Sequence, residues 1–180
     1  TTSDLVTFSP AGTGAVNRTT QAKLRDVISV KDFGATGDGV ADDTTKIQNA
    51  VDALDSDGQT LYFPKGNYKT TQPIRLTNRQ TKLVGQSYQN TIISFTLTGT
   101  DEGAWVTSTS YTVGDIVQFT DGFSYQVLIA HTSGTFSTDL AAGKWEMWSA
   151  VSIRASDIEI SGLYIIVPDK GIGISINGAA

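Results

Sequence analysis

Residues 30–39 read Val30-Lys31-Asp32-Phe33-Gly34-Ala35-Thr36-Gly37-Asp38-Gly39, and this stretch decides the fold of the chain. It predicts a short strand that carries Val30 and Phe33 inward, followed by a tight turn whose three glycines adopt conformations that other residues avoid. Glycines at this spacing could also cradle a phosphate. No Lys-Ser or Lys-Thr pair follows them, as a Walker loop requires, so we interpret them as turn glycines.

An amphipathic helix is predicted directly after this turn, over residues 42–54. Ile47, Ala50, Val51 and Leu54 fall at i, i+3, i+4 and i+7, which places them on one face of a helix. The helix begins with residues suited to capping and to the helix dipole, namely Asp42, Asp43 and Thr44. Asp57-Gly58 is expected to end the helix and to start a turn.

Short strands separated by polar or glycine-containing turns are predicted in most of the remaining chain. They cover residues 60–63, 68–70, 74–76, 82–84, 91–95, 152–153, 157–160, 163–165 and 173–176. Two stretches look alike, Lys82-Leu83-Val84-Gly85 and Glu159-Ile160-Ser161-Gly162, because each places an apolar residue after a charged one and ends at a corner glycine. Stacked coils of short strands need this pattern. A β-sandwich would give similar spacing, so the pattern leaves both architectures open.

The order of motifs in residues 29–68 resembles the opening of the pectate-lyase-like superfamily. The motifs are Ser29-Val30-Lys31-Asp32-Phe33-Gly34-Ala35, Gly37-Asp38-Gly39, Asp42-Asp43-Thr44, Ile47-Gln48 and Leu61-Tyr62-Phe63-Pro64-Lys65-Gly66-Asn67-Tyr68. The resemblance implies an all-β fold: the start of a right-handed parallel β-helix, capped by a short N-terminal α-helix. Ala41 departs from the pattern, where threonine is expected as the helix N-cap, and Asp42 is expected to replace it.

The arm that precedes these motifs resembles the linker of bacteriophage tailspikes, which are capsular polysaccharide depolymerases. The resemblance rests on residues 5–16, Arg18-Thr19 and Lys23-Leu24-Arg25. We also expect a short helix over residues 18–27, with Thr19 or Thr20 as N-cap. The tailspike resemblance implies a homotrimer in the virion, acting outside the cell, attached to other phage tail or baseplate proteins and directed at a bacterial surface polysaccharide.

Residues 103–148 break the rhythm of short strands and concentrate the aromatic residues. We therefore divide the chain into an arm (1–28), a capping helix with first rungs (29–102), an aromatic β insert (103–148) and resumed, incomplete rungs (149–180). The insert resembles small chitin-binding-type modules, although a proline usual before the last tryptophan is missing. Its candidate carbohydrate-binding residues are Trp105, Tyr111, Tyr125, Trp145 and Trp148. A module of this size has little else from which to build a core, so most of these rings are expected inside it.

Composition restricts the function further. The formal net charge is −5 and there is no cysteine, which argues against nucleic-acid binding and excludes disulfides and thiolate metal sites. No apolar run approaches the roughly 20 residues that a membrane-spanning helix needs. We expect no cofactor, no metal and no membrane insertion.

The acidic residues and the single histidine carry weak signals of catalysis. Asp38, Asp42 and Asp43 lack the regular ligand spacing of a calcium loop, so turn formation and capping explain them. Asp157 and Glu159 lie two apart on a predicted strand, and a solvated face explains them as well as a hydrolase pair does. His131 has no partner that would make it catalytic. We assign no catalytic residue.

Three roles remain for the chain. It could be the N-terminal region of a trimeric tailspike that joins the virion to an enzymatic β-helix, with the catalytic residues outside this segment. It could instead be a self-contained glycan-binding module that acts through the insert, or an enzyme, hydrolase or lyase, that completes its site between chains. The first role is favoured for two reasons. Each coil takes roughly twenty residues, so this chain supplies only a few coils, fewer than a catalytic groove needs. We also expect the chain to end in the middle of a coil, without the polar cap that terminal repeats require.

Overall fold

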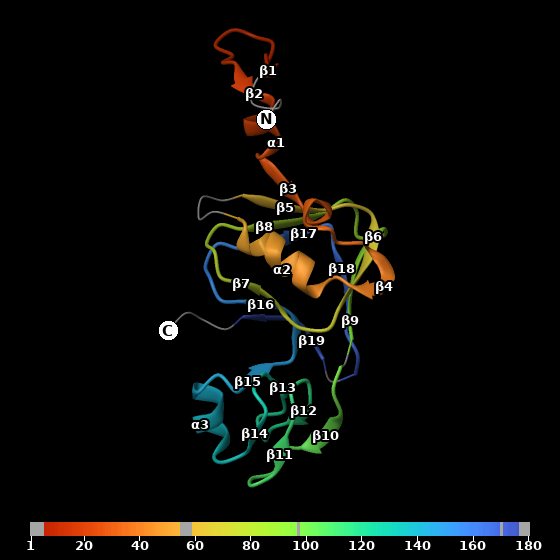
Figure 1. Cartoon of the computed structure of the whole chain (residues 1–180), viewed down its shortest axis with the longest axis vertical. Coiled ribbons are helices and arrows are strands. Elements are labelled where there is room, and N and C mark those ends of the chain that lie inside the picture. The colour runs from red at the N-terminus through yellow and green to blue at the C-terminus, as the bar shows by residue number, and fades with distance from the viewer. Residues whose placement is uncertain (1–5, 55–58, 97, 170, 177–180) are drawn as a thin grey trace.

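The computed structural model describes residues 6–54, 59–96, 98–169 and 171–176. Figure 1 shows three parts along the long axis, namely a thin N-terminal arm, a body of stacked strands and a smaller insert at the end opposite the arm. Leu5 of the arm, the predicted turn at Asp57-Gly58 and the final residues 177–180 lie outside the described residues.

Three parallel sheets build the body, and successive turns of the chain contribute to them in the same order. The first sheet contains β3 (Val27–Ser29), β5 (Thr60–Phe63), β8 (Lys82–Gly85) and β17 (Glu159–Ser161). The second contains β4 (Asp38–Asp42), β6 (Gly66–Thr70), β9 (Thr91–Phe95) and β18 (Tyr164–Ile166). The third contains β7 (Ile74–Leu76), β16 (Ser149–Ile153) and β19 (Ile172–Ile176). Parallel pairing between equivalent strands of successive turns is the arrangement of a parallel β-helix, and it rules out the β-sandwich.

Equivalent residues stack from coil to coil, which is the first of the two architectures that the sequence pattern left open. Ile28, Leu61, Leu83 and Ile160 form one ladder through the first sheet. The two similar stretches lie directly on each other, since Lys82 pairs with Glu159 in the register and through a 3.1 Å ion pair. The interior of the coils is filled by fully buried apolar side chains, including Leu61, Phe63, Tyr68, Ile74, Leu76, Leu83, Ile93 and Val151.

Helix α2 (Thr44–Asp52) takes the place of the third strand in the first coil and packs on η2 (Val30–Phe33) and β7. The predicted apolar face is confirmed, because Ile47, Ala50, Val51 and Leu54 are all buried in the core of the body. The helix is shorter than the predicted range of 42–54, since Asp42 ends β4. Asp42 nevertheless serves the helix start: its carboxylate accepts hydrogen bonds from the backbone N–H of Thr44 at 2.9 Å and from the Thr71 hydroxyl at 2.6 Å.

The strand predicted at Val30 is wrong, since these residues form the short 3₁₀ helix η2. A capping box explains the difference: the Ser29 hydroxyl accepts from the N–H of Lys31, and the Asp32 carboxylate accepts from the N–H of Ser29. Gly34, with φ at 84°, then ends the turn. Val30 still points inward and is fully buried.

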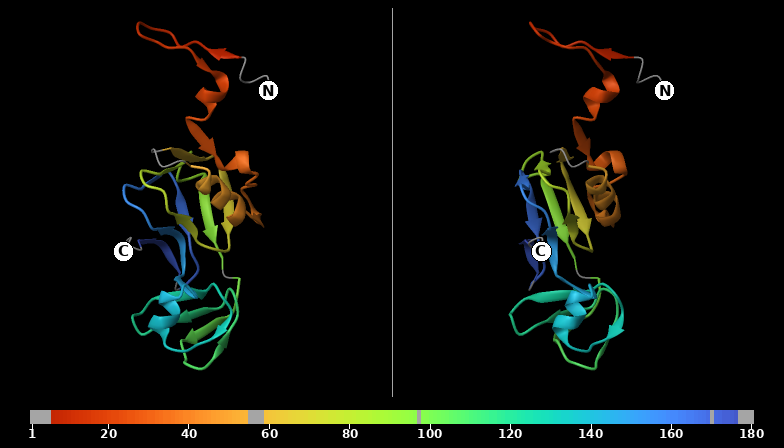
Figure 2. Two further views of the ribbon diagram at one scale, coloured as in Figure 1. Left: turned by 60° about the vertical axis from the view of Figure 1, so that its left-hand side comes forward. Right: turned by 90° about the vertical axis from the view of Figure 1, so that its left-hand side faces the viewer.

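The arm projects away from the body as a hairpin followed by a single helical segment, as both views in Figure 2 show. Strands β1 (Thr7–Phe8) and β2 (Arg18–Thr19) pair antiparallel, and α1 (Thr20–Leu24) follows. The Thr19 cap is confirmed, since its hydroxyl accepts from the N–H of Ala22 at 3.0 Å. The helix is shorter than the predicted range of 18–27 and has no buried residue.

The insert leaves the third coil after β9 and returns to it at β16. One sheet combines β10 (Asp101–Ala104), β12 (Ile116–Gln118), β13 (Ser124–Val127) and β15 (Trp145–Met147). Strands β11 (Ser110–Tyr111) and β14 (His131–Thr132) pair separately, and α3 (Phe136–Ala141) covers the aromatic core. The chain leaves and returns at neighbouring points, because the ring centroids of Phe95 and Trp148 are 5.6 Å apart.

Candidate functional site

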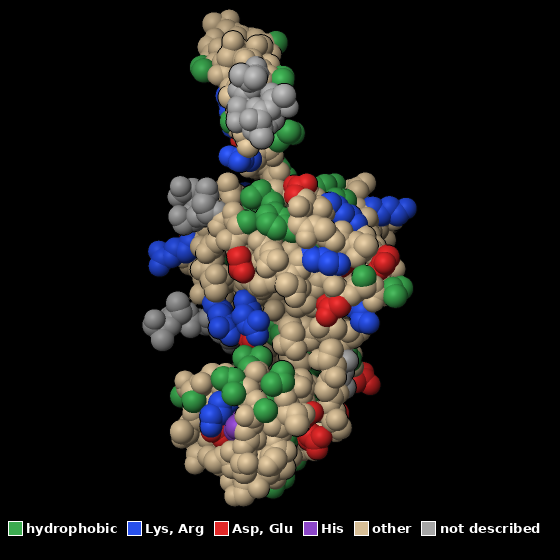
Figure 3. Space-filling view, in the orientation of Figure 1, with side chains coloured by type: hydrophobic (Ala, Val, Ile, Leu, Met, Phe, Trp, Pro, Cys, Tyr) green, Lys and Arg blue, Asp and Glu red, His purple; other side chains and the backbone are tan. Residues whose placement is uncertain are grey.

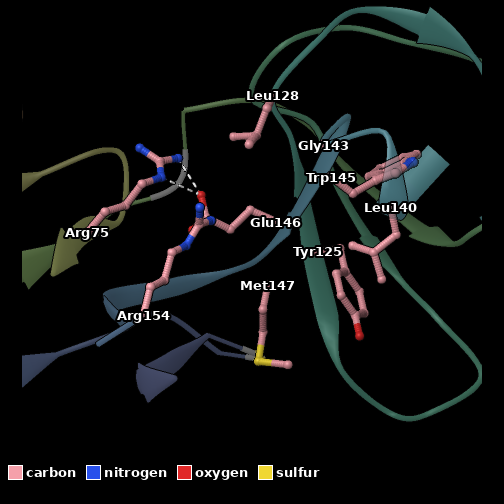
Figure 4. A pocket seen from close by; sticks show the side chains of 9 residues that line it. All are labelled: Arg75, Tyr125, Leu128, Leu140, Gly143, Trp145, Glu146, Met147 and Arg154. Atoms are coloured by element: carbon pink, nitrogen blue, oxygen red, sulfur yellow. Dashed lines mark hydrogen bonds and ion pairs between the residues drawn. The ribbon is translucent and has the colours of Figure 1, made fainter. Parts of the chain in front are cut away.

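A pocket of about 430 Å³ opens where the insert meets the β-helix, and we call it the junction pocket (Figure 4). Its charged lining consists of Arg75, Glu146 and Arg154. Arg75 comes from β7, Arg154 directly follows β16, and Glu146 lies on β15 of the insert. Figure 3 shows basic side chains gathered at this boundary, next to apolar side chains of the insert. The pocket therefore draws its walls from both parts of the molecule.

Glu146 is the centre of the pocket's polar side. Its carboxylate is buried, and Oε2 accepts from Nε of Arg75 at 2.8 Å and also from Nη2 of the same residue. Oε1 accepts from Nη2 of Arg154 at 2.6 Å. Charge-assisted hydrogen bonds of this kind are among the strong ones in proteins, and here they fix the insert to the coils.

Strand alternation explains why Glu146 reaches the coils while its neighbour does not. Successive side chains on β15 point to opposite faces of the sheet. Trp145 turns into the aromatic core of the insert, where its ring centroid lies 5.1 Å from that of Tyr111. Glu146 then faces the body, as Figure 4 shows, and its strand is held in place by antiparallel pairing with Gln126 of β13.

The other side of the pocket is mostly apolar, with Leu128, Leu140 and Met147 around the ring of Tyr125. The Tyr125 hydroxyl donates to Oδ2 of Asp121 at 2.7 Å. Burial, together with that hydrogen bond, raises the pKa of Tyr125 to about 12, so the phenol stays protonated at neutral pH. The pocket thus pairs a cationic wall with an apolar one.

The five aromatic residues proposed for sugar binding lie mainly inside the molecule. Tyr111, Tyr125, Trp145 and Trp148 are buried, and Trp105 is half-buried against Phe119 and Phe136. This agrees with the expectation that most of these rings form the core. Of the five, Tyr125 and Trp145 also line the junction pocket. Sugar binding through these rings stays a prediction.

The acidic residues singled out in the sequence serve local structure. Asp43 is buried and accepts from the N–H groups of Thr36 and Gly37, both at 2.8 Å, while Asp38 accepts from the N–H groups of Val40 and Ala41. In the described part of the chain, no three acidic or histidine side chains are grouped as a metal site would require.

The strand geometry expected for Asp157 and Glu159 is wrong. Asp157 lies in a turn with φ at 61°, and β17 begins only at Glu159, so the two side chains do not share a strand face. Nδ1 of His131 lies 2.7 Å from the carbonyl oxygen of Ile129, and the ring packs against Trp145. Its Nε2 lies 3.5 Å from Oδ2 of Asp139, so the histidine has an acidic neighbour that the sequence did not indicate.

Replacing Glu146 by glutamine should loosen the insert from the coils. The substitution removes the carboxylate charge that pairs with two guanidinium groups, and we expect the free energy of unfolding to fall by about 2 kcal/mol. Urea denaturation followed by tryptophan fluorescence reports on this region, because all three tryptophans lie in residues 103–148. Glu102→Gln, at an exposed glutamate of β10, is the matched control. Equal midpoints for both variants would refute the bridging role of Glu146.

Comparison with known proteins places most of the chain in one family. Residues 27–178 match the family described as rhamnogalacturonase A/epimerase, pectate lyase-like. The chain is 38% identical over 91 residues to the plasmin and fibronectin-binding protein A of Streptococcus pneumoniae, covering 44% of this chain and 13% of that protein. It is 54% identical over 44 residues to the mannuronan C5-epimerase AlgE1 of Azotobacter vinelandii, covering 24% of this chain and 3% of that protein. The chain therefore matches only a small part of either relative.

Similar solved structures come from a phage and from the same epimerase group. ORF18 of Geobacillus virus E2 aligns with a TM-score of 0.41 at 26% identity, over 79% of this chain and 25% of that one. The A-module of mannuronan C5-epimerase AlgE6 from Azotobacter vinelandii aligns with a TM-score of 0.45 at 20% identity, over 84% of this chain and 41% of that one. Within the described residues, no helix is long and apolar enough to cross a membrane.

Proposed function

The chain belongs to the rhamnogalacturonase A/epimerase, pectate lyase-like family, and from this premise we propose that it is the N-terminal region of a phage tailspike. In this role it joins the virion to a β-helix that binds or depolymerises a bacterial surface polysaccharide. Its arm faces other phage tail or baseplate proteins, and further coils supply the catalytic groove. The observation that carries the proposal is an arm of exposed apolar residues that continues directly into the first coil.

Several apolar side chains of the arm are largely exposed in the single chain. Val16, Leu24 and Val27 are 73%, 70% and 49% exposed. Helix α1 has five residues and buries none of them, and a helix of that length is not stable on its own in water. A hollow of about 420 Å³, lined by Leu24, Val27, Ile28 and Phe33 among others, lies between the arm and the body. Two further copies of the chain would cover these residues in a homotrimer.

The trimer is tested by the mass of the chain in solution. We expect sedimentation equilibrium to give about three times the 19.1 kDa of one chain. Val27→Asp should yield monomers, because it places a charge in the proposed interface. Val113→Asp makes the same change at a residue of the insert that is 59% exposed, and should leave the trimer intact. A monomeric wild-type chain at tens of micromolar concentration would overturn the trimer.

A second candidate function is glycan binding by this segment itself, through the insert. The junction pocket favours it, since the pocket opens between the insert and the coils and joins polar hydrogen-bond donors to apolar walls. In this second role the glycan would contact the junction pocket, at the boundary between the insert and the coils, and not the buried aromatic rings.

A further inference from the structure

We propose that the junction pocket binds a carboxylate-bearing sugar residue of an acidic polysaccharide, held by the guanidinium groups of Arg75 and Arg154. The proposal rests on the glycan-binding role suggested above, but it stands apart from the trimer, because a monomeric chain would contain the same pocket. It identifies the class of ligand and the residues that recognise it.

The charge of the pocket is the first argument. Among its lining residues Arg75 and Arg154 are cationic and Glu146 is the only anion, so the pocket has one net positive charge in a protein whose formal net charge is −5. The side chain of Glu146 is 1% exposed, whereas those of Arg75 and Arg154 are 29% and 42% exposed. The anion is therefore enclosed and already paired, and the two cations are accessible to a ligand.

Unused hydrogen-bond donors are the second argument. Arg75 directs Nε and Nη2 to Glu146, and Arg154 directs only Nη2 to it. In the described part of the chain, Nη1 of both arginines and Nε of Arg154 make no hydrogen bond. A guanidinium presents its N–H groups in a planar fork that matches the two oxygens of a carboxylate.

The arginines are also held in position before any ligand arrives. The backbone N–H of Arg75 donates to Oε1 of Gln48 at 2.9 Å, and its carbonyl accepts from Nε2 of the same glutamine at 3.1 Å. Glu146 then fixes the two guanidinium groups from a third segment of the chain. Because less side-chain freedom is lost on binding, a fixed site binds more tightly than a mobile one.

The apolar wall distinguishes a sugar from a small inorganic anion. Leu128, Leu140 and Met147 lie on the side of the pocket away from the charges, and Figure 4 shows them around the same opening as the arginines. A sugar ring offers a C–H face to such a surface while its carboxylate reaches the cations. The pocket volume of about 430 Å³ falls in the range of roughly 300 to 1,000 Å³ typical of small-molecule sites.

Calorimetric titration of the whole chain with defined oligosaccharides tests the ligand class. The acidic panel contains tetrasaccharides of mannuronate, guluronate, galacturonate and glucuronate, and the neutral panel contains their uncharged hexose counterparts. We expect at least one acidic member to bind at least tenfold more tightly than its counterpart, with weaker binding at high salt. Failure of every acidic member, or equal binding of the neutral one, would overturn the proposal. Sodium phosphate that displaces the oligosaccharide at an equal concentration would show a general anion site and would reject the sugar.

Variants then test the residues. Arg154→Gln should weaken binding of the acidic oligosaccharide at least tenfold, and Arg154→Lys should restore part of it. Arg79→Gln removes the same charge from an exposed position outside the pocket and should bind like the wild type. Leu140→Glu leaves the three charged residues in place and adds a negative charge at the rim, so it should also weaken binding. Wild-type affinity in both Arg154→Gln and Leu140→Glu would exclude the pocket.

Discussion

Replacing Gly85 by alanine should cost about 3 kcal/mol or more of the free energy of unfolding. A Cβ atom at this position would lie 2.1 Å from the carbonyl oxygen of Gly162 and 2.7 Å from its carbonyl carbon. Both are backbone atoms of the next coil, and no side-chain rotation can move them. Strands β8 and β17 would have to separate at this corner, which breaks the stacking of the two coils. Urea denaturation followed by circular dichroism measures the loss.

Gly134→Ala is the matched control for this substitution. The nearest atom to a Cβ there is a carboxylate oxygen of Asp139 at 3.9 Å, which is ordinary van der Waals contact. Neither Gly85 nor Gly134 has a positive φ, so the comparison isolates the contact between coils. If the two variants unfold at the same urea concentration, the close approach of the coils at Gly85 does not limit stability.

Removing the carboxylate of Asp43 should destabilise the β-helix by a similar amount. The side chain is completely buried and accepts from the N–H of Thr36 at 2.8 Å, its hydroxyl at 2.9 Å and the N–H of Gly37 at 2.8 Å. Lys46 adds an ion pair at 3.2 Å. Asp43→Ala leaves these three donors without their acceptor and opens a gap where the buried carboxylate was, and we expect a loss of about 3 kcal/mol. Asp38→Ala, at an exposed acid of the same turn, should cause a much smaller loss in the same urea experiment.

The same contacts predict a dependence on pH. Burial alone would raise the pKa of Asp43, but the hydrogen bonds from Thr36 and Gly37 outweigh it and hold the pKa below the ordinary value of 3.8. The unfolded chain therefore binds the proton more readily. The stabilisation is complete above about pH 4 and is lost as the pH falls through the lower pKa of the folded state. The urea midpoint of Asp43→Asn should fall less than that of the wild type on acidification, and parallel curves would contradict this.

The sequence predicted the body better than any other part, because the coils repeat a local pattern. Leu83 and Ile160 could be matched to each other from their similar surroundings, and the structure pairs them. The face of α2 followed from the spacing of Ile47, Ala50 and Val51. The 3₁₀ helix at Val30 was missed because it depends on side-chain hydrogen bonds of Ser29 and Asp32, which override the preference of the apolar residues for a strand.

The junction pocket could not be predicted in the same way. Arg75 and Glu146 are 71 residues apart, and no repeat in the sequence indicates how the insert docks on the coils. One signal was present, since Glu146 is a charged residue between Trp145 and Met147 and must be either solvated or paired. For the aromatic candidates, composition identified the cluster, but ring exposure depends on tertiary packing, and four of the five rings are buried.

The contact between Phe95 and Trp148 has a consequence for how such chains diversify. The insert begins and ends at adjoining points of one coil, so the strands on either side keep their places whatever lies between them. Insertions at such positions are tolerated because closing a longer loop adds little entropic cost. Recombination could thus replace the whole insert in a single event, together with Glu146 and one wall of the pocket. Arg75 and Arg154 belong to the coils, so they would remain and would line the boundary with the new insert.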